Sequence, residues 1–298
     1  MKLSKWLTQV VDRRVSQGSL SEGSAGLYKA AHRRLPNKLL GLELAEIKRR
    51  DIEEAVASMN TRGLSPATIK HSLTILGSAF NDAMDNELIQ ANPAVRIKTP
   101  KKKTRLNRNV ADDGLKRLLT VAANHPYGWL LRFALGSGLR RGELLALNWG
   151  DIDLTAGTVA VNKSIIVVDN KERISTPKTA SSTRVVTLPP AIVAEALRRR
   201  GNLDDDNAVF VSSQKCRMAL STASDRIKEM LVEAGLPDQT LHSLRHTHAS
   251  QLVSSGCPLP AIAQRMGHAN VATTMSVYAH ASASEDAKLA AAIGNAVS

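Results

Sequence analysis

The chain has 298 residues, more than one hydrophobic core usually supports, and its hydrophobic content of 43% is enough for two folded domains, which excludes a mainly disordered protein. It has no run of eighteen apolar residues and no charged segment leading into a short apolar one, so we expect neither a membrane-spanning nor a secreted protein. Its two cysteines, Cys216 and Cys257, suit neither a disulfide framework nor a metal site, and we expect a cytoplasmic, nucleoid-associated protein.

The charge of the chain predicts a polyanionic partner. Forty basic residues against 27 acidic ones give a net charge of +13 and a sequence pI near 10.0. Residues 1–105 hold 19 of the basic residues and 10 of the acidic ones, so this first third has a net charge of +9. Aromatic residues make up only 3% of the chain, which leaves few side chains for stacking on single-stranded bases. The expected partner is therefore double-stranded DNA.

The first 96 residues read as four helices and contain no strand signal. Apolar spacing predicts helices at 2–15, from about 24 to 35, from about 50 to 59, and from Ser65 to the Asn92-Pro93 pair. Ser65 followed by Pro66 is typical of a helix start. A plain helical bundle with a solvated face explains this pattern equally well, and the excess of basic residues favours contact with DNA.

A basic segment, IKTPKKKTRLNRN at 97–109, has the composition of a linker between two domains. A run of this kind can also act as a localisation signal. Between two domains it is better explained as a strap that follows a phosphate backbone. The side chains that we expect to bind DNA here are Lys98, Lys101, Lys102, Lys103 and Arg105.

Helices at 112–123 and 127–135 are followed by Gly136-Ser137-Gly138, which breaks the chain and holds Arg140 at a turn. The β-branched runs TVAV, SIIVV and RVVTL predict a small antiparallel sheet, with Lys178 in the connection before the last strand. Two further helices are predicted at 190–200 and 219–234. Taken singly, Arg140 fits an ordinary surface corner and Lys178 an ordinary solvated hairpin.

The stretch from Leu241 to His280 gathers polar side chains within a helical pattern. His242 and Arg245 lie three residues apart on one helical face, in a helix that Gly256 and Pro258 end. A second short helix from Pro260 ends at Gly267 and presents His268, and a third carries Tyr278. Two plainer readings remain open. Tyr278 also fits an apolar stripe with Val271 and Met275, and His242 and His246 have zinc spacing without a carboxylate or cysteine to complete a site.

Five motifs occur in a fixed order: GLRRGE, PKT, HSLRH, MGH, and a tyrosine ten residues later. In this order the chain resembles the tyrosine recombinases, the phage integrase family, in their short two-domain form. The resemblance implies a mainly α fold with a small antiparallel β-sheet. It divides the chain into an all-α core-binding domain at 1–96, the linker at 97–109, a mixed α/β catalytic domain at 110–282, and a tail at 283–298 that is a candidate subunit-exchange helix.

The resemblance also implies a reaction, the cleavage and rejoining of duplex DNA through a 3′-phosphotyrosyl intermediate. Tyr278 would be the nucleophile. Two guanidiniums would stabilise the negative charge that develops on the phosphate, and a lysine would give a proton to the departing 5′ oxygen. The side chains implied at the phosphate are Arg140, Lys178, His242, Arg245 and His268. A cationic pocket of this kind does the work of a metal ion, so no metal and no other cofactor is expected.

The implied partners are a specific site in double-stranded DNA, three further copies of the chain in a tetramer, and an accessory directionality factor. Ser243 departs from the family pattern, since many members have aspartate there. We expect no additional small domain ahead of the core-binding helices, and therefore no binding to accessory arm sites. The alternatives are a type IB topoisomerase, a non-enzymatic DNA-binding regulator, and a metal nuclease that uses His242, His246 and His248.

Overall fold

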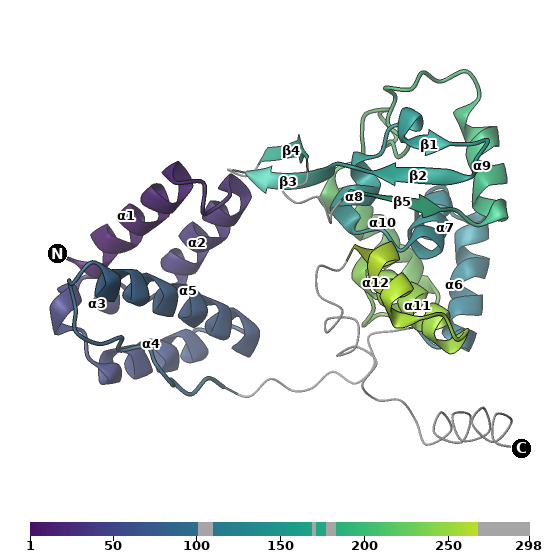
Figure 1. Cartoon of the computed structure of the whole chain (residues 1–298). Helices are drawn as coiled ribbons and strands as arrows, with labels where there is room; N and C mark the ends of the chain where they lie inside the picture. Colours follow the sequence, from purple (N-terminus) through teal and green to yellow (C-terminus); the bar gives the residue numbers. More distant parts are fainter. Residues whose placement is uncertain (101–109, 169–170, 177–182, 268–298) are drawn as a thin grey trace, which may run out of the picture. The chain divides into compact units, whose positions relative to one another are not determined.

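The computed structural model describes residues 1–100, 110–168, 171–176 and 183–267 (Figure 1). The chain divides into two compact units, one made of Met1–Arg105 with Val167–Lys171 and the other of Leu106–Ile166 with Glu172–Ser298. None of the described helices is both long enough and apolar enough to cross a membrane.

Residues 1–100, the main part of the N-terminal unit, are built from helices and the turns that join them, and the fourth predicted helix starts where the sequence indicates. The Ser65 hydroxyl accepts a hydrogen bond from the Thr68 backbone N–H at 3.2 Å, and Pro66 occupies the first turn. The core packs Trp6, Ile52 and Phe80 together. The elements are α1 (Leu3–Ser16), α2 (Glu22–Arg34), α3 (Asn37–Leu40), the 3₁₀ helix η1 (Leu44–Glu46), α4 (Arg49–Thr61) and α5 (Pro66–Asp85).

The all-α prediction for this part is confirmed, and two of its elements were not predicted. Helix α3 has four residues and η1 has three, and neither length spans enough turns to show a hydrophobic repeat. Three of the four longer helices differ from their predicted bounds by one or two residues. The predicted end of the fourth at Asn92-Pro93 was wrong: α5 ends at Asp85, and Glu87 has a positive φ of 57°, which a helix does not allow.

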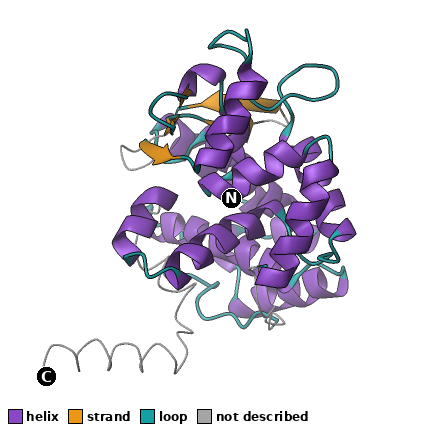
Figure 2. Ribbon diagram, turned by 90° about the vertical axis from the view of Figure 1, so that its right-hand side faces the viewer, coloured by secondary structure: helices purple, strands orange, loops and turns teal. Residues whose placement is uncertain are grey.

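The rest of the described chain mixes helices with short strands. The elements are α6 (Asp112–Asn124), α7 (Gly128–Ser137), α8 (Arg141–Ala146), η2 (Trp149–Asp151), β1 (Ile152–Asp153), β2 (Thr158–Val161), β3 (Ser164–Val168), β4 (Lys171–Ser175), β5 (Arg184–Thr187), α9 (Pro190–Arg200), α10 (Leu220–Glu233), α11 (Leu241–Ser254) and α12 (Leu259–Met266). Figure 2 shows that the strands are confined to one part of a chain that is otherwise helical. The predicted fold class, mainly α with a little antiparallel β, is confirmed.

The strands form two sheets where the sequence predicted one. Strands β1, β2 and β5 make a three-stranded antiparallel sheet in that order, with Val159 opposite Val186, and β3 pairs with β4 separately. The β4 segment KERIS was not predicted. Its side chains are almost all exposed, so it lacks the apolar alternation that marks a strand buried on one face.

The hydrophobic core of the C-terminal unit fixes the helices that carry the candidate site. Trp129, Phe133 and Phe210 form an aromatic cluster in which Phe133 meets the other two rings edge to face, at 5.2 and 5.4 Å between centroids. Leu244 of α11 is fully buried in the same core. Helices α7 and α11 are therefore both anchored in this core. The turn that follows α7 is held against α11.

Candidate active site

Of the six residues predicted at the phosphate, three lie in the described chain. Arg140 precedes α8, and His242 and Arg245 lie in the first two turns of α11. Lys98, from the predicted DNA-binding set, is described and exposed. The remaining predicted residues, Lys178, His268, Tyr278, Lys101, Lys102, Lys103 and Arg105, lie outside the described residues, as does the tail at 283–298.

Arg245 is a buried cation, with only 3% of its surface exposed. Its Nη1 donates a hydrogen bond of 2.6 Å to the carbonyl oxygen of Gly138, and its Nη2 donates to the carbonyl oxygen of Met266. A buried charge is costly unless it is hydrogen-bonded, and these two carbonyls come from the end of α7 and the end of α12. The position of the guanidinium is thus set by three helices.

Gly138 can supply its carbonyl only because it has no side chain. It ends α7 in the left-handed conformation, with φ of 67°. A Cβ at this position would lie 2.5 Å from Cδ2 of His248. The backbone of the turn therefore packs directly against the His248 ring. This contact fixes the position of the Gly138 carbonyl that accepts the hydrogen bond from Arg245.

Arg140 is the more accessible of the two arginines, with 42% of its side chain exposed. Its Nη1 donates to Oε1 of Glu143 at 2.8 Å and its Nη2 donates to the carbonyl oxygen of Gly267 at 2.6 Å. A guanidinium has five N–H donors, so the side chain can keep both of these bonds and still bind an anion. Arg140 is therefore held in place but remains available to a ligand.

Glu143 and Arg184 belong to the same cluster, and the sequence reasoning missed both. Glu143 accepts a hydrogen bond from the backbone N–H of Arg140 at 2.8 Å, as a glutamate does at the third position of a helix. That spacing of three residues was a readable signal. Arg184 lies on β5 and binds both oxygens of the Glu143 carboxylate, at 3.1 and 2.9 Å. No local signal marks it, because its partner is 41 residues away.

The Glu143 carboxylate is ionised in this environment. Burial by itself would raise its pKa, but the hydrogen bonds and charge of Arg184 and the hydrogen bonds from Arg140 outweigh burial and lower the pKa below its ordinary value. The cluster thus consists of one carboxylate between two guanidiniums. The Arg140 guanidinium is paired with this carboxylate through Nη1, and the Arg140 side chain is still partly exposed to solvent.

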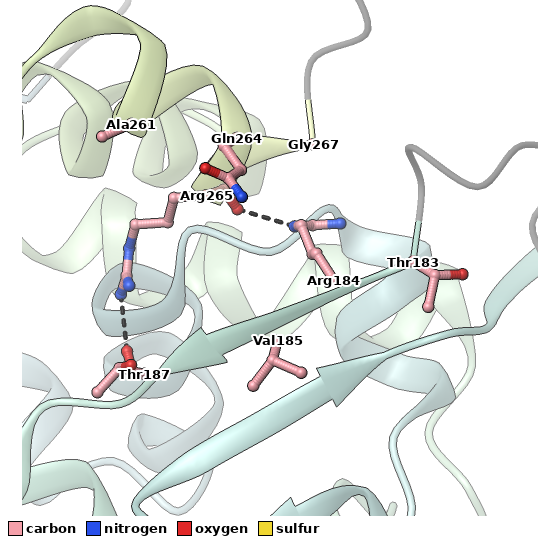
Figure 3. A pocket seen from close by; sticks show the side chains of 8 residues that line it. All are labelled: Thr183, Arg184, Val185, Thr187, Ala261, Gln264, Arg265 and Gly267. Atoms are coloured by element: carbon pink, nitrogen blue, oxygen red, sulfur yellow. Dashed lines mark hydrogen bonds between the residues drawn. The ribbon is translucent and has the colours of Figure 1, made fainter.

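Three arginines bind three consecutive carbonyls at the end of α12. Arg184 Nε donates to the carbonyl of Arg265 at 2.8 Å, and Arg245 and Arg140 donate to those of Met266 and Gly267. Figure 3 shows Arg184 reaching from β5 to this last turn. The C-terminus of a helix carries a partial negative charge, so cations there are favoured. The structure brings Arg140 and Arg245 together at the backbone that immediately precedes His268.

His242 and Arg245 line one hollow of about 700 Å³ beside this cluster. His242 is exposed, and its ring meets that of His246 edge to face with centroids 4.6 Å apart. The hollow is also lined by Arg141 and Lys228, which add positive charge to its wall, and by one carboxylate, Asp225, which offsets part of that charge. A ligand with several negative oxygens fits the chemistry of this surface.

His248, the third histidine of the metal alternative, faces a different direction. Its Nδ1 lies 2.8 Å from the carbonyl oxygen of Leu135, and its Nε2 accepts a hydrogen bond from Nε of Arg265 at 3.0 Å. These partners require the neutral ring with its proton on Nδ1. Burial, reinforced by the positive charge of Arg265, lowers the pKa of His248 to about 4. Both ring nitrogens are therefore engaged with protein groups.

Comparison with known proteins places the chain among enzymes that cut and join DNA. The model of the Phage integrase family matches residues 96–285. The chain is 31% identical over 241 residues to the tyrosine recombinase XerC of Alcanivorax borkumensis, covering 77% of this chain and 74% of the relative. It is 28% identical over 275 residues to a XerC-like tyrosine recombinase of Caldanaerobacter subterraneus subsp. tengcongensis, covering 82% and 70%.

Solved structures share the fold. The Tn1549 transposon integrase in complex with a circular intermediate DNA superposes with a TM-score of 0.86, covering 98% of this chain and 99% of that one at 19% identity. A lambda integrase dimer bound to a COC′ core site superposes with a TM-score of 0.69, covering 93% and 95% at 18% identity. At these identities the likeness establishes the fold alone.

Proposed function

This chain belongs to the phage integrase family, and we propose that it is a site-specific recombinase that cleaves and rejoins duplex DNA through Tyr278. The family and enzyme class predicted from the order of the motifs are confirmed by the matches to the integrase family and the XerC recombinases. The same matches do not favour the topoisomerase alternative.

In the proposed reaction the Tyr278 oxygen attacks the scissile phosphorus. The bond to the 5′ oxygen breaks, that oxygen leaves as a hydroxyl after taking a proton, and a 3′-phosphotyrosyl bond remains. A 5′-hydroxyl from a second duplex then attacks the same phosphorus and releases the tyrosine. One phosphoester bond forms for each that breaks, so the sequence of steps needs no nucleotide cofactor.

We assign the other predicted residues by their chemistry. Arg140 and Arg245 would donate hydrogen bonds to the non-bridging oxygens as negative charge develops on them. His242 and His268 would complete the pocket, one of them helping Tyr278 to lose its proton, and Lys178 would protonate the 5′ oxygen. The observation that supports this assignment best is that Arg140 and Arg245 bind the adjacent carbonyls of Gly267 and Met266, the two residues before His268.

DNA is the proposed partner of the whole chain. The net charge of +9 in residues 1–105 supports a core-binding role for the helical unit at 1–96 and a phosphate-following role for the linker at 97–109. We further propose that four copies assemble on two DNA sites, that the tail at 283–298 docks on a neighbouring subunit, and that an accessory directionality factor is a further partner. The proposed location is the cytoplasm, on the nucleoid.

The test is the formation of a covalent adduct. Nicked duplexes tiled across the DNA that flanks the gene are incubated with the protein in excess EDTA, and the trapped junction is mapped. Wild-type protein should form an adduct at one site, whereas Tyr278→Phe should bind that site with unchanged affinity and form none. Arg245→Ala keeps the nucleophile and loses one electrostatic donor, which typically lowers such a rate by about 10² to 10³-fold. An adduct formed by Tyr278→Phe, or cleavage that EDTA abolishes, would refute the proposal.

A further inference from the structure

We propose that Arg184 is a positioning residue for DNA cleavage, holding Glu143, and through it Arg140, against the last turn of α12. The inference rests on the proposed function, in which Arg140 binds the scissile phosphate. It begins from the burial of the pair: only 6% of the Arg184 side chain and 8% of the Glu143 side chain are exposed. A buried ion pair contributes little net stability, so its presence calls for another reason.

The geometry of the pair supplies that reason. Both Nη atoms of Arg184 bind the two oxygens of Glu143, and the same carboxylate binds the backbone N–H and the Nη1 of Arg140. Glu143 thus receives four hydrogen bonds, two from each arginine. Arg184 sets the plane of the carboxylate because its fork is rigid, and one oxygen of that carboxylate in turn holds Nη1 of Arg140.

Arg184 also fixes the second support of Arg140. Its Nε donates to the carbonyl oxygen of Arg265, two residues before the Gly267 carbonyl that Arg140 uses. Gly267 lies so close to the guanidiniums that a Cβ there would be 2.8 Å from Nη1 of Arg184 and 3.3 Å from Nη1 of Arg140. One side chain on β5 therefore links the turn before α8 to the end of α12.

A matched pair elsewhere in the same unit separates positioning from stability. Arg132 binds both oxygens of Glu195 at 2.7 to 3.0 Å and donates its remaining nitrogen to the carbonyl of Ala122 at 2.7 Å, which repeats the pattern of Arg184 away from the site. Arg184→Gln and Arg132→Gln each remove a guanidinium that joins a carboxylate to a helix carbonyl. Only the first of these carboxylates holds Arg140.

The measurement is the single-turnover rate of adduct formation on the mapped nicked duplex, at saturating protein, together with affinity for that duplex and thermal unfolding. We expect Arg184→Gln to lower the rate by roughly the 10² to 10³-fold of a lost electrostatic donor, with affinity within about twofold of wild type. Arg132→Gln should keep the wild-type rate even if its unfolding temperature falls as much as that of Arg184→Gln. Arg184→Lys restores a single point charge and should recover part of the rate.

The pH profile distinguishes an action through Glu143 from a general loosening of the fold. The charged groups that face Glu143 in the described chain are Arg140 from its own helix start and Arg184 from β5. Without Arg184 the effect of burial is less opposed and the Glu143 pKa rises, so the carboxylate takes up a proton at a pH where that of wild type stays ionised. The rate of Arg184→Gln divided by the wild-type rate should therefore fall as pH is lowered. In the Glu143→Gln background this ratio should be independent of pH, and adding Arg184→Gln should cost little more.

The outcomes separate the two proposals. If Arg184→Gln cleaves as fast as Arg132→Gln, Arg184 is a structural residue and the positioning role is wrong. The same holds if the rate decrease of the double variant equals the product of the decreases in Arg184→Gln and Glu143→Gln, because the two residues would then act independently. If wild-type protein forms no adduct, or Tyr278→Phe forms one, the proposed function itself falls whatever the Arg184 variants do.

Discussion

Gly138→Ala tests whether the turn after α7 is fixed by direct contact with His248. The substitution adds one methyl group at a residue with φ of 67°, where it would lie 2.5 Å from Cδ2 and 2.9 Å from Nε2 of the histidine ring. The left-handed conformation costs a residue with a side chain about 1 kcal/mol, and forced overpacking in a core adds about 1 to 3 kcal/mol. We therefore expect a decrease of about 2 to 4 kcal/mol in the free energy of unfolding.

Gly235→Ala is the matched control, because Gly235 follows α10 with φ of 75° and a methyl group added there would have no neighbour within 4 Å. Its unfolding free energy should fall only by the backbone part, about 1 kcal/mol. Urea unfolding of both variants is best followed in a Trp6→Phe background, where the two remaining tryptophans, Trp129 and Trp149, report on the C-terminal unit alone. Cleavage should also slow in Gly138→Ala, because the displaced turn moves the carbonyl that Arg245 binds.

Equal destabilisation of the two glycine variants would refute the reasoning, since the contact with His248 would then contribute nothing. Normal cleavage by a strongly destabilised Gly138→Ala protein would show that the turn does not control the position of Arg245. In that case the hydrogen bond between them would not set the position of the guanidinium.

Two further predictions concern charge. Replacing Lys101–Lys103 with glutamine should reduce the slope of log affinity against log salt by about 0.9 for each phosphate that is no longer neutralised, and an unchanged slope would remove the linker from the DNA interface. Because the pKa of His248 is about 4 in the folded chain and that of His32 is lowered to about 4 as well, the unfolded chain binds more protons than the folded one between these values and the ordinary histidine pKa. The contribution of the two neutral histidines to the free energy of unfolding is then fully present above about pH 6.5. It is lost as pH is lowered toward 4, by up to about 3 kcal/mol for each histidine. Urea midpoints at pH 7.5 and pH 5.0 measure this, and a His248→Gln variant whose stability fell as much as that of wild type would exclude His248 as a source.

The helices could be predicted from the sequence because their signals are local. The Ser65-Pro66 start of α5 and the glycine end of α12 each depend on neighbours within one turn of the chain. The two sheets could be predicted only in part, because β4 has no buried face to produce alternation. Pairing of strands is a long-range property, and the sequence predicted the strands without their division into two sheets.

The residues of the candidate site show the same difference between local and long-range signals. Motif order predicted Arg140, His242 and Arg245 as candidates, and the proximity of Arg140 to Arg245 is a structural observation that the motifs alone do not contain. Glu143 was within reach of the sequence, since a glutamate three residues after a helix start has a known role. Arg184 was not, because nothing in a strand of four residues indicates which helix end lies above it.

The burial of Arg245 follows from what surrounds it. An isolated guanidinium in a core would be strongly destabilising, whereas here it caps the negative end of α12 and binds the carbonyl of Gly138, which ends α7. Arg140 and Arg184 cap the same helix end, so three positive charges share the partial charge of one helix and the full charge of Glu143. That balance leaves the cluster with an excess of positive charge in fixed positions. Donors whose orientation is set before a reaction do not have to reorganise while charge develops, which is the condition under which electrostatic stabilisation is strongest. The end of α12 is accordingly a part of the proposed cleavage site even though it contributes carbonyls rather than side chains.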